Sequence, residues 1–354
     1  MSGIEVTGRA QERAWYAGTL PDVERVRPGL WSVPVPIPTN PLRYVLVYLL
    51  ELADGVAVVD TGWSTEEAWS ALTAGLATAG YAVGDVRAAL ITHIHPDHYG
   101  LAGRLREASG AWVALHPADA ALLPARYGFD IEGLLKSMRA LLAECGVPDD
   151  VAGELGAASM GIREFVHLAE PDVLLEDMAR VELSGWDVVA VHTPGHSPGH
   201  LCFYDRDHRF LLSGDHILPR ISPNVSVHAQ QMGNPLADFL DALVRVRSLD
   251  VVEVLPAHEW RFRPLAQRVE QLLQHHRDRL DEAAAVVSSQ PGLTCWDATL
   301  RLRWSRDWAQ ITGFMRRAAV GETLAHLVLL ESRGVIRREG SLPARWYPCF
   351  VQAD

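Results

Sequence analysis

Three histidines and an aspartate lie within six residues of the stretch Thr-His-Ile-His-Pro-Asp-His-Tyr-Gly, which starts at Thr92 directly after an apolar run. Imidazole nitrogens beside a carboxylate are typical of a hydrolytic or oxidative metal site rather than of a thiolate-closed structural one. Side chains alternate along an extended segment, so His93 and His95 can face one ion while Asp97 and His98 face another. The alternative is a histidine-rich surface turn.

Four more short segments place polar side chains directly after predicted strands. They are Asp60-Thr61-Gly62, Thr193-Pro194-Gly195-His196, Gly214-Asp215 and Pro256-Ala257-His258. Taken singly, each has a simpler explanation, such as an Asx-turn at Asp60 or a hydrogen-bonded histidine at a strand end. Taken together at successive strand ends, they predict one cluster of metal ligands.

Composition limits the classes of protein to consider. With 354 residues, 48% of them hydrophobic, the chain is long enough for about two domains. The first residues lack the pattern of a secretory signal, and no apolar run approaches the about 18 residues of a membrane span. Four scattered cysteines without a Cys-x-x-Cys pair favour a reducing compartment. We therefore expect a cytoplasmic protein with no membrane partner.

The elements that must position these residues alternate between strands and helices. Residues 1–28 are expected to be irregular or partly helical, and residues 30–116 read as strands interrupted by two helices, an α/β arrangement. Residues 117–172 form a predicted helical insertion, which would be either a lid over the site or a plain packing element. Strands return from residue 181, beginning with Val181 to Leu183, and continue to residue 255.

The combined pattern resembles the metallo-β-lactamase fold superfamily. The resemblance covers about residues 30–260, with every motif filled in the family's order. It implies an αββα sandwich with a dinuclear metal site at one edge. By that resemblance one ion would be held by His93, His95 and His196, and the second by Asp97, His98 and His258. Asp215 would bridge the two ions.

Details of the resemblance indicate the subclass. His95 stands where the di-iron branch has Glu, and Asp215 stands where true β-lactamases have Cys or no bridging acid. The pattern is similar to that of glyoxalase II-like thioesterases, lactonases, phosphodiesterases and nucleases. Two divalent ions, zinc before iron or manganese, would activate a water as hydroxide. We expect hydrolysis of a small thioester, ester or lactone, with Asp97 and Asp215 catalytic; a mononuclear-iron persulfide dioxygenase shares some of these ligands.

Further residues beside the motifs have weaker assignments. By the resemblance, Asp60 would support the ligand loop without binding metal. The hydroxyl of Tyr99 could line the site or hold the local packing, and His216, beside the bridging acid, could meet substrate. Arg220 lies in a long loop at the same edge and could anchor an acidic group of a substrate. His200 could pack behind the ligand turn.

The predicted division of the chain is a catalytic domain at 1–262 and a small helical C-terminal domain at 263–354. A helix opening at Val320, followed by a short basic hairpin, resembles a winged helix, and an endoribonuclease branch of the superfamily has a similar tail. Residues 296–354 carry a net charge of +3, against −15 for the rest. This modest charge favours a structural or dimerising role; the alternative is a phosphodiesterase that binds nucleic acid through this tail.

Overall fold

The computed structural model describes residues 3–38, 40–128, 130–231 and 233–349. The chain forms two compact units, each assembled from three segments. Unit 1 comprises residues 1–123, 163–223 and 242–270, and unit 2 comprises residues 124–162, 224–241 and 271–354. Each unit is thus discontinuous in sequence, whereas the two domains expected from the sequence, 1–262 and 263–354, are each one continuous segment. The expected domain boundary stays a prediction.

The first sheet of unit 1 has seven strands in the order β2-β3-β4-β5-β6-β7-β8. Their bounds are β2 (Glu24–Arg27), β3 (Leu30–Pro36), β4 (Tyr44–Leu52), β5 (Gly55–Val59), β6 (Val86–Leu90), β7 (Trp112–Leu115) and β8 (Val173–Leu174). Strands β5 to β8 run parallel. The central strands are almost wholly apolar because both of their faces are covered.

The second sheet of unit 1 has six strands in the order β1-β13-β12-β11-β10-β9. Their bounds are β1 (Glu5–Val6), β13 (Phe262–Arg263), β12 (Glu253–Pro256), β11 (Phe210–Gly214), β10 (Leu201–Asp205) and β9 (Val188–His192). The lead-in is more ordered than predicted, since β1 pairs with β13 and β2 joins the first sheet. The strand expected at Val181 to Leu183 was wrong: only an isolated bridge from Arg180 to Val189 forms there.

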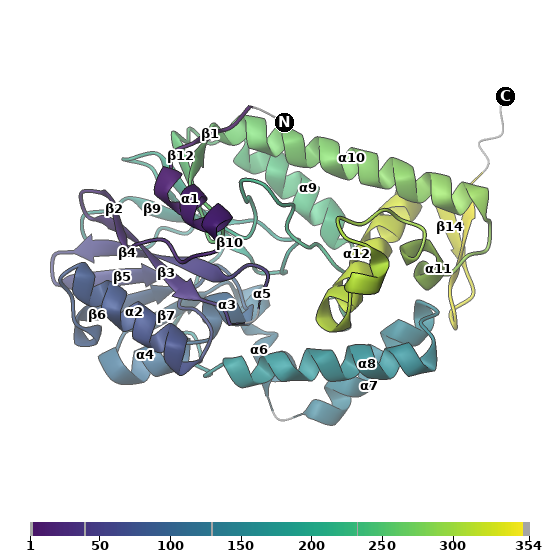
Figure 1. Cartoon of the computed structure of the whole chain (residues 1–354), viewed down its shortest axis with the longest axis horizontal. Helices are drawn as coiled ribbons and strands as arrows, with labels where there is room; N and C mark the ends of the chain where they lie inside the picture. The colour runs from purple at the N-terminus through teal and green to yellow at the C-terminus, as the bar shows by residue number, and fades with distance from the viewer. Residues whose placement is uncertain (1–2, 39, 129, 232, 350–354) are drawn as a thin grey trace. The chain divides into compact units, whose positions relative to one another are not determined.

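The two sheets pack face to face over one hydrophobic core. Its members come from both sheets, for example Leu46 and Tyr48 of β4 with Phe203 of β10 and Leu212 of β11. The outer face of the first sheet carries α2 (Glu66–Thr78) and α4 (Ala102–Ser109), which lie beside its strands (Figure 1). This confirms the predicted αββα class, and the burial of apolar surface between the layers is what stabilises it.

Local sequence signals explain where these helices begin. The Thr65 hydroxyl accepts a hydrogen bond from the Ala68 amide (3.1 Å), and two acids occupy the first turn of α2, as expected at a helix N-terminus. Unit 1 also contains α1 (Arg9–Ala17), α3 (Pro96–Tyr99) and α5 (Pro117–Ala120). Both α3 and α5 begin with proline directly after a histidine.

The strand ends gather the polar segments at one edge of the sandwich. In the first sheet β5, β6 and β7 are parallel, so the residues that follow them meet. In the second sheet β11 and β12 are parallel, and the turn from β9 to β10 ends at the same edge. The backbone joins the sheets there, because the Leu201 amide donates to the Thr92 carbonyl (2.7 Å).

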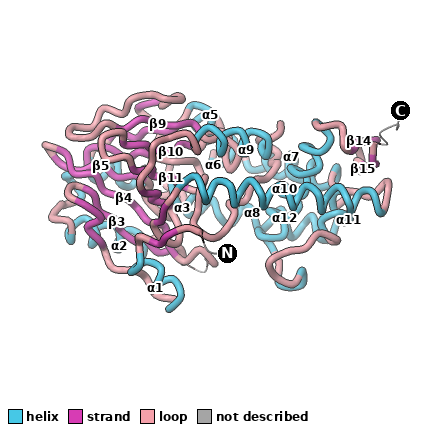
Figure 2. Tube along the Cα trace, turned by 90° about the horizontal axis from the view of Figure 1, so that it is seen from above, coloured by secondary structure: helices cyan, strands magenta, loops and turns pink. Residues whose placement is uncertain are grey.

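Unit 2 is mainly helical: Figure 2 draws its helices in cyan and the strands of its short hairpin in magenta. Its segments contribute to α6 (Leu123–Tyr127), α7 (Ile131–Glu144), α8 (Asp149–Met160), α9 (Pro235–Val246), α10 (Leu265–Ser289), α11 (Cys295–Thr299), α12 (Gly313–Ser332) and the hairpin of β14 (Ile336–Glu339) and β15 (Arg345–Pro348). The predicted insertion does contain helices, and the hairpin is where it was expected. The helix expected to open at Val320 begins at Gly313. None of the helices described in either unit is long and apolar enough to cross a membrane.

Candidate metal centre

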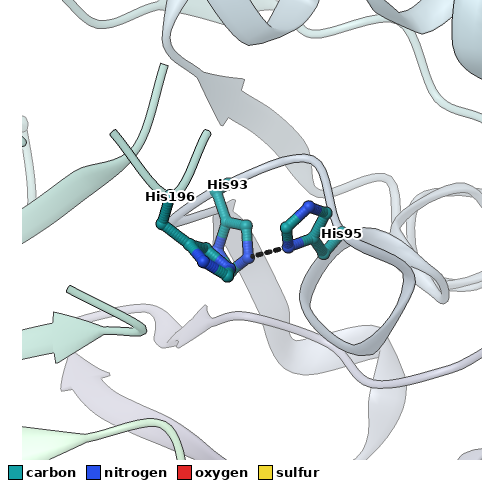
Figure 3. Close-up of side chains that lie close together, drawn as sticks. All are labelled: His93, His95 and His196. Atoms are coloured by element: carbon teal, nitrogen blue, oxygen red, sulfur yellow. Dashed lines mark hydrogen bonds between the residues drawn. The ribbon is translucent and has the colours of Figure 1, made fainter. Parts of the chain in front are cut away.

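The ligand residues predicted from separate motifs converge at the sheet edge. Three groups have ligand atoms within 4.8 Å of one another: His93, His95 and His196; His93, His98 and Asp215; Asp97, His98 and His258. Figure 3 shows His93, His95 and His196 together, with Nε2 of His93 and Nδ1 of His95 joined at 2.8 Å. All seven predicted ligands therefore belong to one cluster, and binding of metal by them stays a prediction.

Asp215 occupies the middle of this cluster. Its Oδ2 is 3.4 Å from Nε2 of His196, while its Oδ1 is 3.2 Å from Nε2 of His258 and 3.5 Å from Nε2 of His98. One carboxylate thus faces a histidine of the first predicted set with one oxygen and two histidines of the second set with the other. This arrangement is what a bridging ligand requires.

The donor set fits divalent cations. Two ligands about 2.1 Å from one ion in a tetrahedral arrangement are about 3.4 Å apart. The distances from Asp97 Oδ2 to Nε2 of His258 (3.4 Å) and of His98 (3.6 Å) agree with this spacing. Nε2 of His98, Nε2 of His258 and Oδ1 of Asp215 are buried and form no hydrogen bond with the described residues. Buried polar atoms left in this way are costly without a partner.

The outer nitrogens of the histidines are held by neighbouring groups. Nδ1 of His258 donates to the Tyr44 carbonyl (2.8 Å), which leaves Nε2 facing the centre. Nδ1 of His98 is 2.8 Å from Oδ2 of Asp60. Such contacts fix the ring orientation and tautomer of metal-binding histidines. Asp60 therefore has the supporting position that the resemblance implied, and its left-handed backbone (φ 64°) is unusual for a residue other than glycine.

The electrostatics of the cluster reflect carboxylates facing buried imidazoles. Burial opposes charge on both His98 and His258, but the nearby carboxylates outweigh it. Asp60, Asp97 and Asp215 raise the pKa of His98 well above its usual range, and Asp215 with Asp97 raises the pKa of His258 to about 10. Conversely, the histidines overcome burial and hold the pKa of Asp215 well below the ordinary value of a carboxyl. The cluster thus buries anions that need cationic partners.

Thr92, His200 and Asp119 hold the ligands in place. Sequence reasoning gave Thr92 and Asp119 no role and expected His200 to pack behind the ligand turn. The Thr92 amide donates to Oδ1 of Asp60 (2.8 Å), and its hydroxyl lies 3.0 Å from Nδ1 of His93. Nε2 of His200 accepts from the Asp215 amide (3.1 Å). A Cβ on Gly214 would lie 2.7 Å from this nitrogen, which explains the glycine before Asp215.

The remaining predicted residues lie near the cluster but contact other groups. The Tyr99 hydroxyl accepts from the Ala169 amide (2.8 Å) and donates to the Ala169 carbonyl, which is the packing alternative. His216 is fully buried, and burial lowers its pKa to about 3; its contact with substrate stays a prediction. Arg220 donates through Nε to Glu259 (2.9 Å), a buried acid next to His258, and its role as a substrate anchor stays a prediction.

Comparison with known proteins agrees with the geometry. The family model of the metallo-beta-lactamase superfamily matches residues 40–258. The structure of a metallo-beta-lactamase family protein from Thermus thermophilus superimposes with a TM-score of 0.78 and 35% identity, covering 92% of this chain and 100% of that one. The protein named Probable metallo-hydrolase YqjP of Bacillus subtilis is 26% identical over 300 residues, 82% of this chain and 89% of its own length.

A more limited match concerns a protein with a named activity. The human protein Acyl-coenzyme A thioesterase MBLAC2 is 28% identical over 128 residues, which is 36% of this chain and 40% of that protein. The family model spans more than half of the present chain and ends at His258, the last residue of the cluster. By its sequence, its sandwich fold and its clustered histidines and aspartates, this chain belongs to the metallo-beta-lactamase superfamily of metallo-hydrolases.

Proposed function

We propose that this protein is a metal-dependent hydrolase that cleaves a small thioester or ester, including a lactone. It would use two divalent ions, with zinc as the preferred metal. The observation that carries the proposal is the position of Asp215, whose two oxygens face the two predicted ligand sets. A shared carboxylate is the feature that distinguishes a dinuclear centre from two separate histidine groups.

The chain's own residues suit hydrolysis by water. Bound divalent ions would supply Lewis acidity and lower the pKa of water. Asp97 is buried, and the neighbouring His98 and His258 outweigh the effect of burial and lower its pKa, which keeps it ionised beside the proposed ions. Its role as acceptor of the water's proton is part of the proposal. Cys202 is no competing nucleophile, because burial raises the pKa of its thiol to about 12.

The thioester is favoured over other bonds by similarity. The stretch shared with the human acyl-coenzyme A thioesterase covers about a third of this chain, so the bond type is a proposal and the acyl group is left open. Hydrolysis of a thioester, ester or lactone requires the same parts: a water held near a carboxylate, and positive charge near the carbonyl oxygen.

Small substrates are favoured over nucleic acids by the state of the basic hairpin in unit 2. Arg337 is paired with Glu339, and Arg338 is 2.9 Å from Glu144. The Arg345 guanidinium donates to the Gly292 carbonyl (2.7 Å). Arginines engaged in this way must give up these contacts before they can bind phosphates. We therefore propose a small-molecule substrate, and a homodimer stays a prediction.

The direct test is release of thiol from a panel of acyl-coenzyme A and acyl-glutathione thioesters. Zinc-loaded protein should release thiol, and an Asp215→Ala variant should not. The metal content of both proteins is measured in the same samples. If protein that holds two ions leaves every thioester intact, the thioesterase assignment fails, and lactones and then RNA become the substrates to assay.

A further inference from the structure

Asp119 connects the two loops that carry the first group of ligands. It lies in α5, directly after β7, and its side chain is fully buried. One oxygen, Oδ2, accepts from the Ile94 amide (2.9 Å) and from the Ser197 hydroxyl (2.8 Å). The other oxygen, Oδ1, accepts from the Gly199 amide (2.7 Å). One carboxylate therefore binds segments that are about a hundred residues apart in the chain.

The contacted groups are immediate neighbours of three ligands. Ile94 lies between His93 and His95, and Ser197 follows His196. An amide between two ligands fixes the backbone from which both side chains project. We propose that Asp119 is a positioning residue that sets the distance between the His93–His95 loop and the His196 loop, and so controls the affinity of the first metal ion.

A second observation shows that this approach is built into the sequence. A Cβ placed on Gly199 would lie 2.5 Å from the Asp119 amide nitrogen and 2.8 Å from its Cβ. Real Cβ atoms do not come this close to backbone atoms. Only glycine at position 199 therefore lets the His196 loop approach the Asp119 carboxylate. The residue type at this position is thus matched to Asp119.

The other ligand group has different supports. His98 is held by Asp60, and His258 by the Tyr44 carbonyl. Loss of Asp119 should therefore weaken the first ion and spare the second. Outer partners of metal ligands are commonly worth about 10–100-fold in metal affinity. The inference rests on the proposed function only in requiring that the cluster binds metal.

The test compares Asp119→Asn with Asp205→Asn. Asp205 is a matched control, because it is equally buried and accepts from the Asp187 amide (3.2 Å), the His208 amide (2.7 Å) and Nδ1 of His208 (2.8 Å), at the far end of β10. Zinc is removed stepwise with a chelator, and the two dissociation constants are measured. His196→Ala and His258→Ala identify which step belongs to which ligand group.

His196→Ala should abolish one of the two zinc dissociation steps. We expect Asp119→Asn to raise the dissociation constant of that same step by about 10–100-fold and to leave the other constant within about twofold. Asp205→Asn should change neither constant. Unchanged constants, or equal weakening of both steps, would overturn the inference. If Asp119→Asn does not fold, Ser197→Ala, which removes one of the three hydrogen bonds, is judged by the same criterion with a smaller effect.

Failure of the proposed function gives a different result. Wild-type protein that binds two ions but hydrolyses no substrate refutes the proposed activity and leaves the role of Asp119 standing. An active wild type whose Asp119→Asn variant retains both constants refutes the inference alone. The inference about Asp119 is also overturned if wild-type protein shows no zinc dissociation step that His196→Ala removes.

Discussion

Two groups of buried histidines in this protein differ in what they face. At the sheet edge of unit 1, His98 and His258 face carboxylates, which raise the pKa of both rings. In unit 2, Nδ1 of His276 lies 3.4 Å from Nε2 of His326, and both rings are almost fully buried. There burial is the main cause, and it lowers the pKa of His276 to about 2 and that of His326 to about 4.

The carboxyl groups show the same contrast. Histidines lower the pKa of Asp215 well below the ordinary range, whereas burial raises the pKa of Glu322 in unit 2. His276 and His326 are therefore buried in neutral form, and Nδ1 of His326 donates to the Glu322 carbonyl (2.8 Å). The sheet edge buries charge. Buried charge is costly unless it is paired or coordinates metal, so the difference supports the proposed metal centre at the sheet edge.

The largest effect is expected from Asp215→Asn, which replaces one shared oxygen by an amide nitrogen that cannot coordinate. The variant should retain at most one ion, and its kcat/KM should fall by more than the about 100-fold that is typical of losing an outer partner. Metal analysis and steady-state kinetics check this. Retention of two ions with normal turnover would show that Asp215 does not bridge.

A smaller and more selective effect is expected from Asp97→Asn. If Asp97 accepts the proton of the attacking water, turnover should fall by about 100-fold or more, while the metal content falls much less. Equal losses of metal and turnover would instead show that Asp97 is only a ligand. The comparison requires assays at saturating zinc, so that weaker binding is not mistaken for slower chemistry.

The ligand cluster could be predicted from sequence because its residue types carry the signal. Histidine and aspartate at successive strand ends are hard to explain otherwise, and the sandwich follows from alternating strands and helices. Asp119 could not be found in this way. It accepts from the Ile94 amide, which pairing of β6 with β7 brings near, and from the Ser197 hydroxyl and the Gly199 amide in the turn from β9 to β10 of the other sheet. Backbone amides leave no mark in a sequence. Its only signal is its place after a strand end, which it shares with Asp60 and His93.

Long-range organisation was also beyond reach from sequence. Residues 124–162 and 224–241 join residues 271–354 in unit 2 through contacts between distant segments. The start of α12 was missed for a local reason: it opens with Gly313, a poor helix former, and Thr312 makes no side-chain cap. The stronger apolar pattern begins at Val320, where the start was predicted.

The dependence of stability on pH should separate the two histidine groups in metal-free protein. Unfolded histidine has a pKa of about 6.5. The raised pKa of His258 gives stability that is complete below that value and is lost as pH rises toward 10. The lowered pKa of His276 has the opposite sign, so stability is lost as pH falls below 6.5.

Denaturant unfolding in chelator, from pH 3 to pH 10, measures both effects. His258→Gln should flatten the alkaline limb and His276→Gln should flatten the acid limb, each by at most about 1.4 kcal/mol per pH unit. Zinc should abolish the alkaline loss in wild-type protein, because the metal replaces the protons. The same change in both variants would contradict the contrast between the two groups.

The smallest effect, and the sharpest check on the comparison, is expected from Glu322→Gln. This repeats the chemical change of Asp215→Asn in unit 2. A carboxyl whose pKa is raised by burial costs stability as pH rises from the pKa of the unfolded group, about 4.3, to the raised pKa of the folded group, and the cost is constant above that. The amide oxygen can still accept from Nδ2 of Asn224, which lies 3.2 Å from Oε2. Glu322→Gln should therefore keep full metal content and activity and gain up to about 1 kcal/mol at pH 7, measured by denaturant unfolding. Loss of stability would show that Glu322 is ionised and paired, and that both regions bury charge in the same way.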